Sequence, residues 1–129
     1  MQSPFLFLGA ICAFLGVGAG AFGAHALKAT LSADMLAVYQ TGVSYQMWHA
    51  LGLFGIGLLQ QQTPESTRVT WAGWLMFVGI LLFSGSLYLL ALLELRWLGM
   101  ITPIGGVCFL IAWVLVCLSV NKKKSKRYN

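Results

Sequence analysis

The chain has 129 residues, of which 59% are hydrophobic and only 9% are charged. A soluble domain carries about 25% charged residues, so this composition argues against a soluble fold. The net charge of +5 does not indicate nucleic-acid binding, because most of the basic residues are gathered in the C-terminal tail. We expect residues 1–129 to form a single membrane domain, with the lipid bilayer as partner and no nucleic acid.

Four long segments contain no Asp, Glu, Lys or Arg: residues 1–27, 35–64, 69–93 and 97–121. Each is long enough to cross a bilayer, which takes about 20 apolar residues in a helix. The apolar runs are continuous and do not alternate, which favours helices over a barrel. The sequence therefore predicts an all-α four-transmembrane-helix bundle, with helices at about 4–26, 33–60, 64–97 and 103–120 and a basic tail at 121–129.

The predicted first helix begins at Pro4, because Ser3 is a good N-cap and Pro suits the first helical position. The helix is rich in small residues, which let membrane helices approach closely. One ridge with a spacing of four contains Cys12, Gly16, Gly20 and Ala24. We expect Gly16 and Gly20 to pack against another helix of the same chain, and a homodimer through this ridge is the alternative.

The later helix starts carry similar signals. Ser32 is the predicted N-cap of the second helix, with Asp34 in the first turn where the helix dipole favours an anion. Thr63-Pro64 and Thr102-Pro103 repeat the pattern found at Ser3-Pro4, and Gly99 is a plausible stop after the third helix. The basic tail indicates the cytoplasmic side. With four spans, both the N-terminus and the C-terminus are then expected in the cytoplasm.

Polar side chains gather in the half of the predicted bundle that lies away from the tail. Such groups usually face the interior and bond to one another. The first interpretation is a structural hydrogen-bond cluster, and the alternative is a pocket for a small ligand, a lipid or a quinone-like molecule. We expect His49 to point into the bundle and bond to the first or third helix. The candidate binding residues are His25, Tyr45, Gln46, His49, Ser86 and Tyr88.

A haem or metal site is a further alternative, since imidazole binds both. His25 and His49 differ in predicted depth by roughly 12 Å of helix rise. No Cys, Met or carboxylate stands near to complete a set of ligands, so we expect neither a metal nor a cofactor. The acids are confined to loops and helix ends, and the sequence shows no Ser/His/Asp set, carboxylate pair or phosphate loop. We therefore expect no enzymatic activity.

Four blocks, GAFGAHALK, YQTGVSYQMWHAL, FSGSLYLL and ITPIGG, follow one another along the chain. They resemble the small four-span membrane proteins typified by bacterial YgdD and YwdK, a family without an assigned activity. The resemblance implies four transmembrane helices and a membrane location, and it assigns no activity, catalytic residue or cofactor. We expect a multi-pass protein of the bacterial inner membrane. The expected function is a non-enzymatic accessory or structural component, acting in a larger membrane complex or as a homo-oligomer.

Overall fold

The computed structural model describes residues 2–121, which contain α-helices, short 3-10 helices and no strand. This confirms the prediction of an all-α protein. The tail beyond Asn121 lies outside the described residues. The long elements are α1 (Pro4–His25), α2 (Ala33–Gln62), α3 (Thr67–Leu93) and α4 (Thr102–Val120), and the short ones are η1 (Leu27–Ala29) and η2 (Arg96–Met100).

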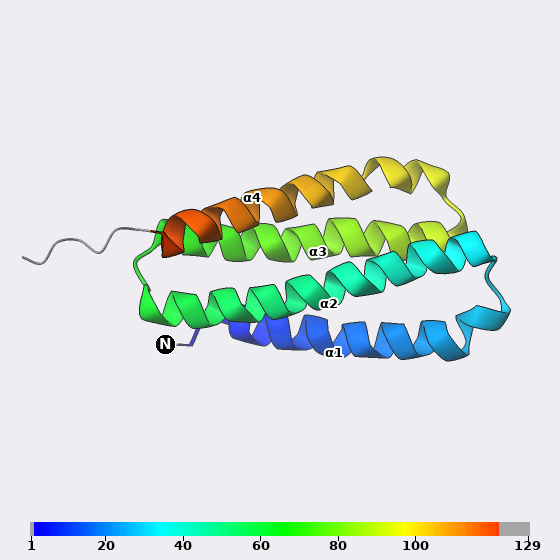
Figure 1. The fold of residues 1–129 in the computed structure, drawn as a ribbon, viewed down its shortest axis with the longest axis horizontal. Coiled ribbons are helices and arrows are strands. Elements are labelled where there is room, and N and C mark those ends of the chain that lie inside the picture. Colours follow the sequence, from blue (N-terminus) through cyan, green and yellow to red (C-terminus); the bar gives the residue numbers. More distant parts are fainter. Residues whose placement is uncertain (1, 122–129) are drawn as a thin grey trace, which may run out of the picture.

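The four α-helices pack in the order of the chain. α1 packs on α2, α2 on α3 and α3 on α4, and each runs opposite to the one before it (Figure 1). Short connections favour this arrangement, because consecutive helices then become neighbours in space. In Figure 1, α1 and α4 form the two outer edges, and α2 and α3 lie between them. The interior helices therefore have partners on two sides.

Three segments are long and apolar enough to cross a membrane: Pro4–Ala29, Thr67–Leu93 and Arg96–Val120. The longest helix, α2 with 30 residues, does not satisfy this criterion. It carries Tyr39, Gln46 and His49, which lower its hydropathy and are all buried in the protein. Hydropathy measures transfer into lipid, whereas the polar face of α2 is transferred into the protein. Composition thus identifies one spanning helix fewer than we predicted.

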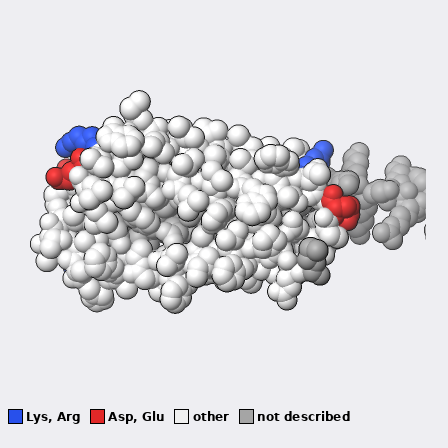
Figure 2. All heavy atoms as spheres, turned by 180° about the vertical axis from the view of Figure 1, so that it is seen from behind, with Lys and Arg blue, Asp and Glu red and all other residues white. Residues whose placement is uncertain are grey.

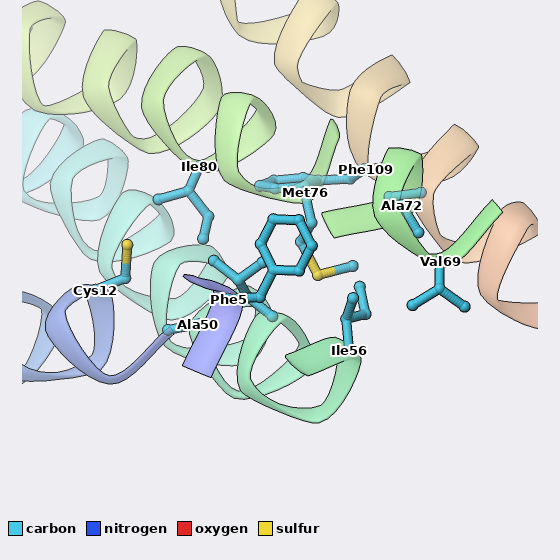
Figure 3. Packing of buried hydrophobic residues seen from close by; sticks show 11 residues of the cluster. Phe5, Cys12, Ala50, Ile56, Val69, Ala72, Met76, Ile80 and Phe109 are labelled. Atoms are coloured by element: carbon cyan, nitrogen blue, oxygen red, sulfur yellow. The ribbon is translucent and has the colours of Figure 1, made fainter. Parts of the chain in front are cut away.

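The core is apolar and is shared by all four helices. Phe5 of α1, Leu53 of α2 and Met76 of α3 are fully buried. Figure 3 shows Phe5 and Met76 in one cluster of buried side chains, and the ring of Phe5 lies directly against Gly73 of α3. Glycine at that position leaves the space which the phenylalanine ring occupies.

The surface is also apolar, as expected where lipid is the solvent. Phe14 is 72% exposed and Trp71 is 63% exposed. Figure 2 shows charged atoms only at the two ends, with an uncharged belt between them. One end carries Lys28, Asp34, Glu94 and Arg96, and the other carries Glu65 and Arg68.

The buried face of α1 differs from the predicted ridge. Gly16 packs against Met47, and the Cβ position of Gly20 lies 3.3 Å from Val43, so both face α2 as expected. Ala24, however, is exposed. The buried positions are instead separated by four, three, four and seven residues. This spacing stays on one side of a helix, whereas steps of four alone drift around it. The buried positions are Phe5, Gly9, Cys12, Gly16 and Gly23.

The predicted start of the third helix was wrong. Thr63 closes α2, because its backbone N–H and its hydroxyl both donate to the carbonyl of Leu59. Pro64 then lies in a turn, and Ser66 caps α3 by accepting from the N–H of Val69 at 3.3 Å. The caps at Ser3 and Ser32 were predicted correctly.

The predicted end of the third helix, at residue 97, was also wrong. α3 ends at Leu93, and Glu94 adopts a left-handed conformation with φ 55° and ψ 33°. Glycine is the usual residue at such a position, so the sequence contained no recognisable stop signal there. Gly99 lies inside η2. α4 begins at Thr102, with a proline in its first turn but no side-chain cap.

Candidate functional site

Gln46 connects three helices. Its Nε2 donates to the backbone carbonyl of Cys12 in α1 at 2.8 Å, and its Oε1 accepts from the hydroxyl of Tyr88 in α3 at 2.5 Å. Gly42 and His49 lie one turn before and one turn after Gln46 on the same face of α2, and both are buried as well. Glycine at position 42 is required by the ring of Tyr88, which lies 2.9 Å from where a Cβ would stand.

Two further hydrogen bonds reinforce this network from hydroxyl groups to backbone carbonyls. Tyr39 donates to Ala19 at 2.6 Å, linking α2 to α1. Ser84 donates to Gly42 at 2.7 Å, linking α3 to α2. A helical carbonyl can accept a second hydrogen bond in addition to the one inside its own helix. The network therefore satisfies polar side chains without interrupting any helix.

His49 points into the protein, as predicted, and is 7% exposed. Its partner is not on the first or third helix, so that part of the prediction was wrong. Trp113 of α4 donates through Nε1 to His49 Nε2 at 3.0 Å. His49 Nδ1 lies 2.8 Å from the carbonyl of Tyr45 on its own helix. Because Nε2 accepts, Nδ1 carries the proton, and the imidazole is neutral with both nitrogens satisfied.

Aromatic rings fill the space beside His49. The ring of Phe109 stacks on the imidazole with centroids 3.6 Å apart and an interplanar angle of 11°. Tyr45 stacks at 5.9 Å, and its own ring contacts Phe83 at 4.4 Å. His49 is thus enclosed by rings from α2 and α4.

The remaining predicted site residues lie apart from Gln46 and His49. Ser86 shares a 2.6 Å hydrogen bond with Thr102 and so joins α3 to α4. His25 is exposed at the end of α1. Gln46 bonds to Cys12 of α1. His25 lies thirteen residues further along α1 than Cys12, which is about 20 Å of helix rise. The structure therefore does not bring the two histidines together, and residues 2–121 contain no cluster of His, Cys, Asp or Glu suited to a metal ion.

A second polar connection, at the other end of the helices, was not predicted. Ser3 of α1's N-cap donates to Gln60 Oε1 of α2, and Gln60 Nε2 donates to Thr70 of α3 at 3.1 Å. These two hydrogen bonds connect the same three helices, α1, α2 and α3, as Gln46 does. Across residues 2–121, no buried side-chain nitrogen or oxygen lacks a hydrogen-bond partner.

Sequence reasoning also missed Tyr39 and Trp113. The position of Tyr39 could have been recognised from its spacing, since Tyr39, Gly42, Gln46 and His49 follow steps of three and four along α2. Trp113 had no such signal in the sequence, because it lies in an otherwise apolar run, and in the structure it is 41% exposed. The backbone acceptors at Ala19, Gly42 and Cys12 depend on close approach of helices, which no local pattern reveals.

An uncharged belt, exposed apolar side chains and polar groups bonded in the interior together define a helical integral membrane protein. Comparison with known proteins agrees. Residues 19–106 match the family described as "Protein of unknown function (DUF423)". No solved structure is significantly similar to the chain.

Two curated relatives cover nearly the whole chain. The UPF0382 membrane protein YwdK of Bacillus subtilis is 51% identical over 118 residues, which are 92% of this chain and 96% of the relative. A UPF0382 membrane protein of Staphylococcus haemolyticus is 50% identical over 118 residues, with 92% and 95% covered. The chain belongs to the DUF423 family, and the resemblance to YwdK is confirmed.

Proposed function

We propose that the protein is a four-span component of the bacterial plasma membrane, with both termini in the cytoplasm, and that its role is structural or accessory and not enzymatic. α2 is the fourth span in this proposal. It runs antiparallel between α1 and α3, and its 30 residues extend about 45 Å. Because α1 and α3 are long and apolar enough to cross the membrane, a helix packed between them along its length crosses the membrane with them. The one charged residue of α2, Asp34, lies in the first turn, and Glu65 stands just beyond its C-terminal end.

The orientation follows from the basic tail. A reporter enzyme fused after Asn129 is expected to be active in the cytoplasm. In a variant with all three native cysteines replaced by alanine, Thr30→Cys is expected to react with a membrane-impermeant maleimide in intact cells, whereas Ser66→Cys is expected to react only after lysis. Protection of position 30 in intact cells would contradict the orientation.

One observation carries the structural role: the interior polar side chains bond to protein atoms on neighbouring helices. A catalytic or ligand site needs groups that remain free for the substrate. Here Gln46 and Tyr88 satisfy one another, and both ring nitrogens of His49 have partners. The enclosure of His49 by Phe109 and Trp113 likewise favours the structural role over a small-molecule pocket in the polar half.

The outward face of α1 supports an accessory role. A wide apolar groove of about 870 Å³ runs along it, lined by residues that include Phe14, Gly18, Phe22 and Tyr39. A Cβ at Gly18 would meet no atom within 4 Å apart from its chain neighbours and the backbone of its own helix. Small residues on an open apolar face allow close approach of another membrane helix. We place the contact with a partner subunit, or with a second copy of this chain, on this groove.

The test is affinity purification from native membranes in mild detergent after cross-linking. The wild type is expected to retain a partner in fixed ratio or to form a discrete homo-oligomer. Gly18→Leu fills the groove and is expected to abolish this association, while Gly85→Leu, on α3 and equally free of nearby atoms, is expected to preserve it. A wild-type monomer without a partner, or equal effects of both variants, would contradict the proposal.

A further inference from the structure

A charged hollow lies at the end of the helices remote from both described chain ends. It has a volume of about 400 Å³ and is lined by Ser32, Asp34, Met35, Leu90, Glu94 and Arg96. These residues come from the start of α2, the end of α3 and the start of η2. Figure 2 shows blue and red atoms side by side at one end of the uncharged belt. The hollow therefore lies where the lipid-facing belt meets the polar boundary.

We propose that this hollow binds a zwitterionic aminoethyl phosphate group, as carried by phosphatidylethanolamine or by free phosphoethanolamine. Two carboxylates and one guanidinium surround the same space. A primary ammonium offers N–H donors to Asp34 and Glu94, and a phosphate accepts from the planar fork of Arg96. A purely anionic ligand would meet two carboxylates, and a purely cationic one would meet Arg96. A zwitterion satisfies both signs at once.

The helix ends that form the hollow favour the same ligand. The N-terminus of α2 carries a partial positive charge, and the C-terminus of α3 carries a partial negative charge. Both ends open onto this space, because α2 and α3 are antiparallel neighbours. The two apolar lining residues, Met35 and Leu90, are partly buried and offer a surface for the first carbons of an acyl chain.

Lipid retention tests the proposal. Full-length protein in detergent is mixed with equal amounts of dihexanoyl phosphatidylethanolamine, phosphatidylcholine and phosphatidylglycerol, and retained lipid is measured by native mass spectrometry. Phosphatidylethanolamine is expected to be preferred, because the quaternary ammonium of choline has no N–H to donate and glycerol has no charge. Arg96→Gln is expected to lower its retention about tenfold, by loss of one charge-assisted contact. Arg68→Gln, at the other end, is the matched control and should leave retention unchanged.

A second variant separates binding from folding. Glu94 occupies a left-handed conformation that glycine adopts more easily, so Glu94→Gly is expected to raise the melting temperature while lowering phosphatidylethanolamine retention. Competition by free phosphoethanolamine identifies the source: displacement shows that the headgroup suffices, and resistance shows that the acyl chains contribute. Three results would overturn the proposal: no preference among the lipids, unchanged retention in Glu94→Gly, or an equal loss in Arg68→Gln.

Discussion

Gly9→Ala is expected to lower the free energy of unfolding by about 1–3 kcal/mol, the usual cost of forcing extra volume into a packed core. A Cβ at this position would stand 2.6 Å from the backbone nitrogen of Phe54 and 2.9 Å from the carbonyl oxygen of Ala50. Both are backbone atoms of α2, so no rotamer change can make room. The two helices would have to separate along the seam that carries the hydrogen bond from Gln46 to Cys12.

A series on α1 makes this test specific. Every Gly→Ala change gains the same helix propensity, so differences within the series report the space around each position. Gly16→Ala should cost less than Gly9→Ala, because it meets the flexible side chain of Met47. Gly20→Ala should cost less still, and Gly18→Ala should give the most stable variant of the four, because nothing lies near it to offset the gain in helix propensity. Thermal unfolding in detergent gives the ranking. If Gly9→Ala and Gly18→Ala had the same melting temperature, α1 would not pack as described.

The fold was largely readable because lipid imposes strong constraints on sequence. Charge-free runs gave four helices, and Ser3 and Ser32 gave correct starts. The errors occurred where a local signal had two readings. Thr63-Pro64 looked like a helix start, yet Thr63 bonds backwards and closes α2. Glu94 ends α3 although it is not glycine, and this depends on the turn into η2 and not on the residue type.

The candidate site was predicted less well. The depth of a residue in the membrane gives its position along the helix axis, but not the helix face on which its side chain lies. Gln46 and Tyr88 were both assigned to the half of the bundle away from the tail, and they do meet. His49 was assigned to the wrong neighbour, since an apolar helix such as α4 gave no reason to expect a polar partner. Trp113, read as part of an apolar run, supplies that partner. Steps of three and four along α2 would have recovered the shared face of Tyr39, Gln46 and His49.

Gln46→Leu is expected to destabilise the protein by about 1–3 kcal/mol, the cost of leaving a partly buried polar group unsatisfied. Leucine removes both hydrogen bonds of the amide at nearly constant size. The carbonyl of Cys12 keeps its bond within α1, but the hydroxyl of Tyr88 loses its acceptor. Tyr88→Phe alone should cost less, because it removes only one of the two hydrogen bonds. The amide oxygen of Gln46 then lacks a donor, but Nε2 keeps its bond to α1.

The double variant Gln46→Leu/Tyr88→Phe gives the decisive measurement. Replacing both partners by apolar groups removes the unsatisfied hydroxyl, so the double variant should be more stable than the sum of the single effects predicts. Hydrogen bonds in membranes average about 0.6 kcal/mol and reach about 1.7, which sets the expected coupling energy. Gln60→Leu combined with Tyr88→Phe is the control and should be additive, because Gln60 lies about 21 Å along α2 from Gln46 and bonds to Ser3 and Thr70. Full additivity in the Gln46 pair as well would mean that the amide and the phenol do not meet, and the structural role of the polar interior would lose its main support.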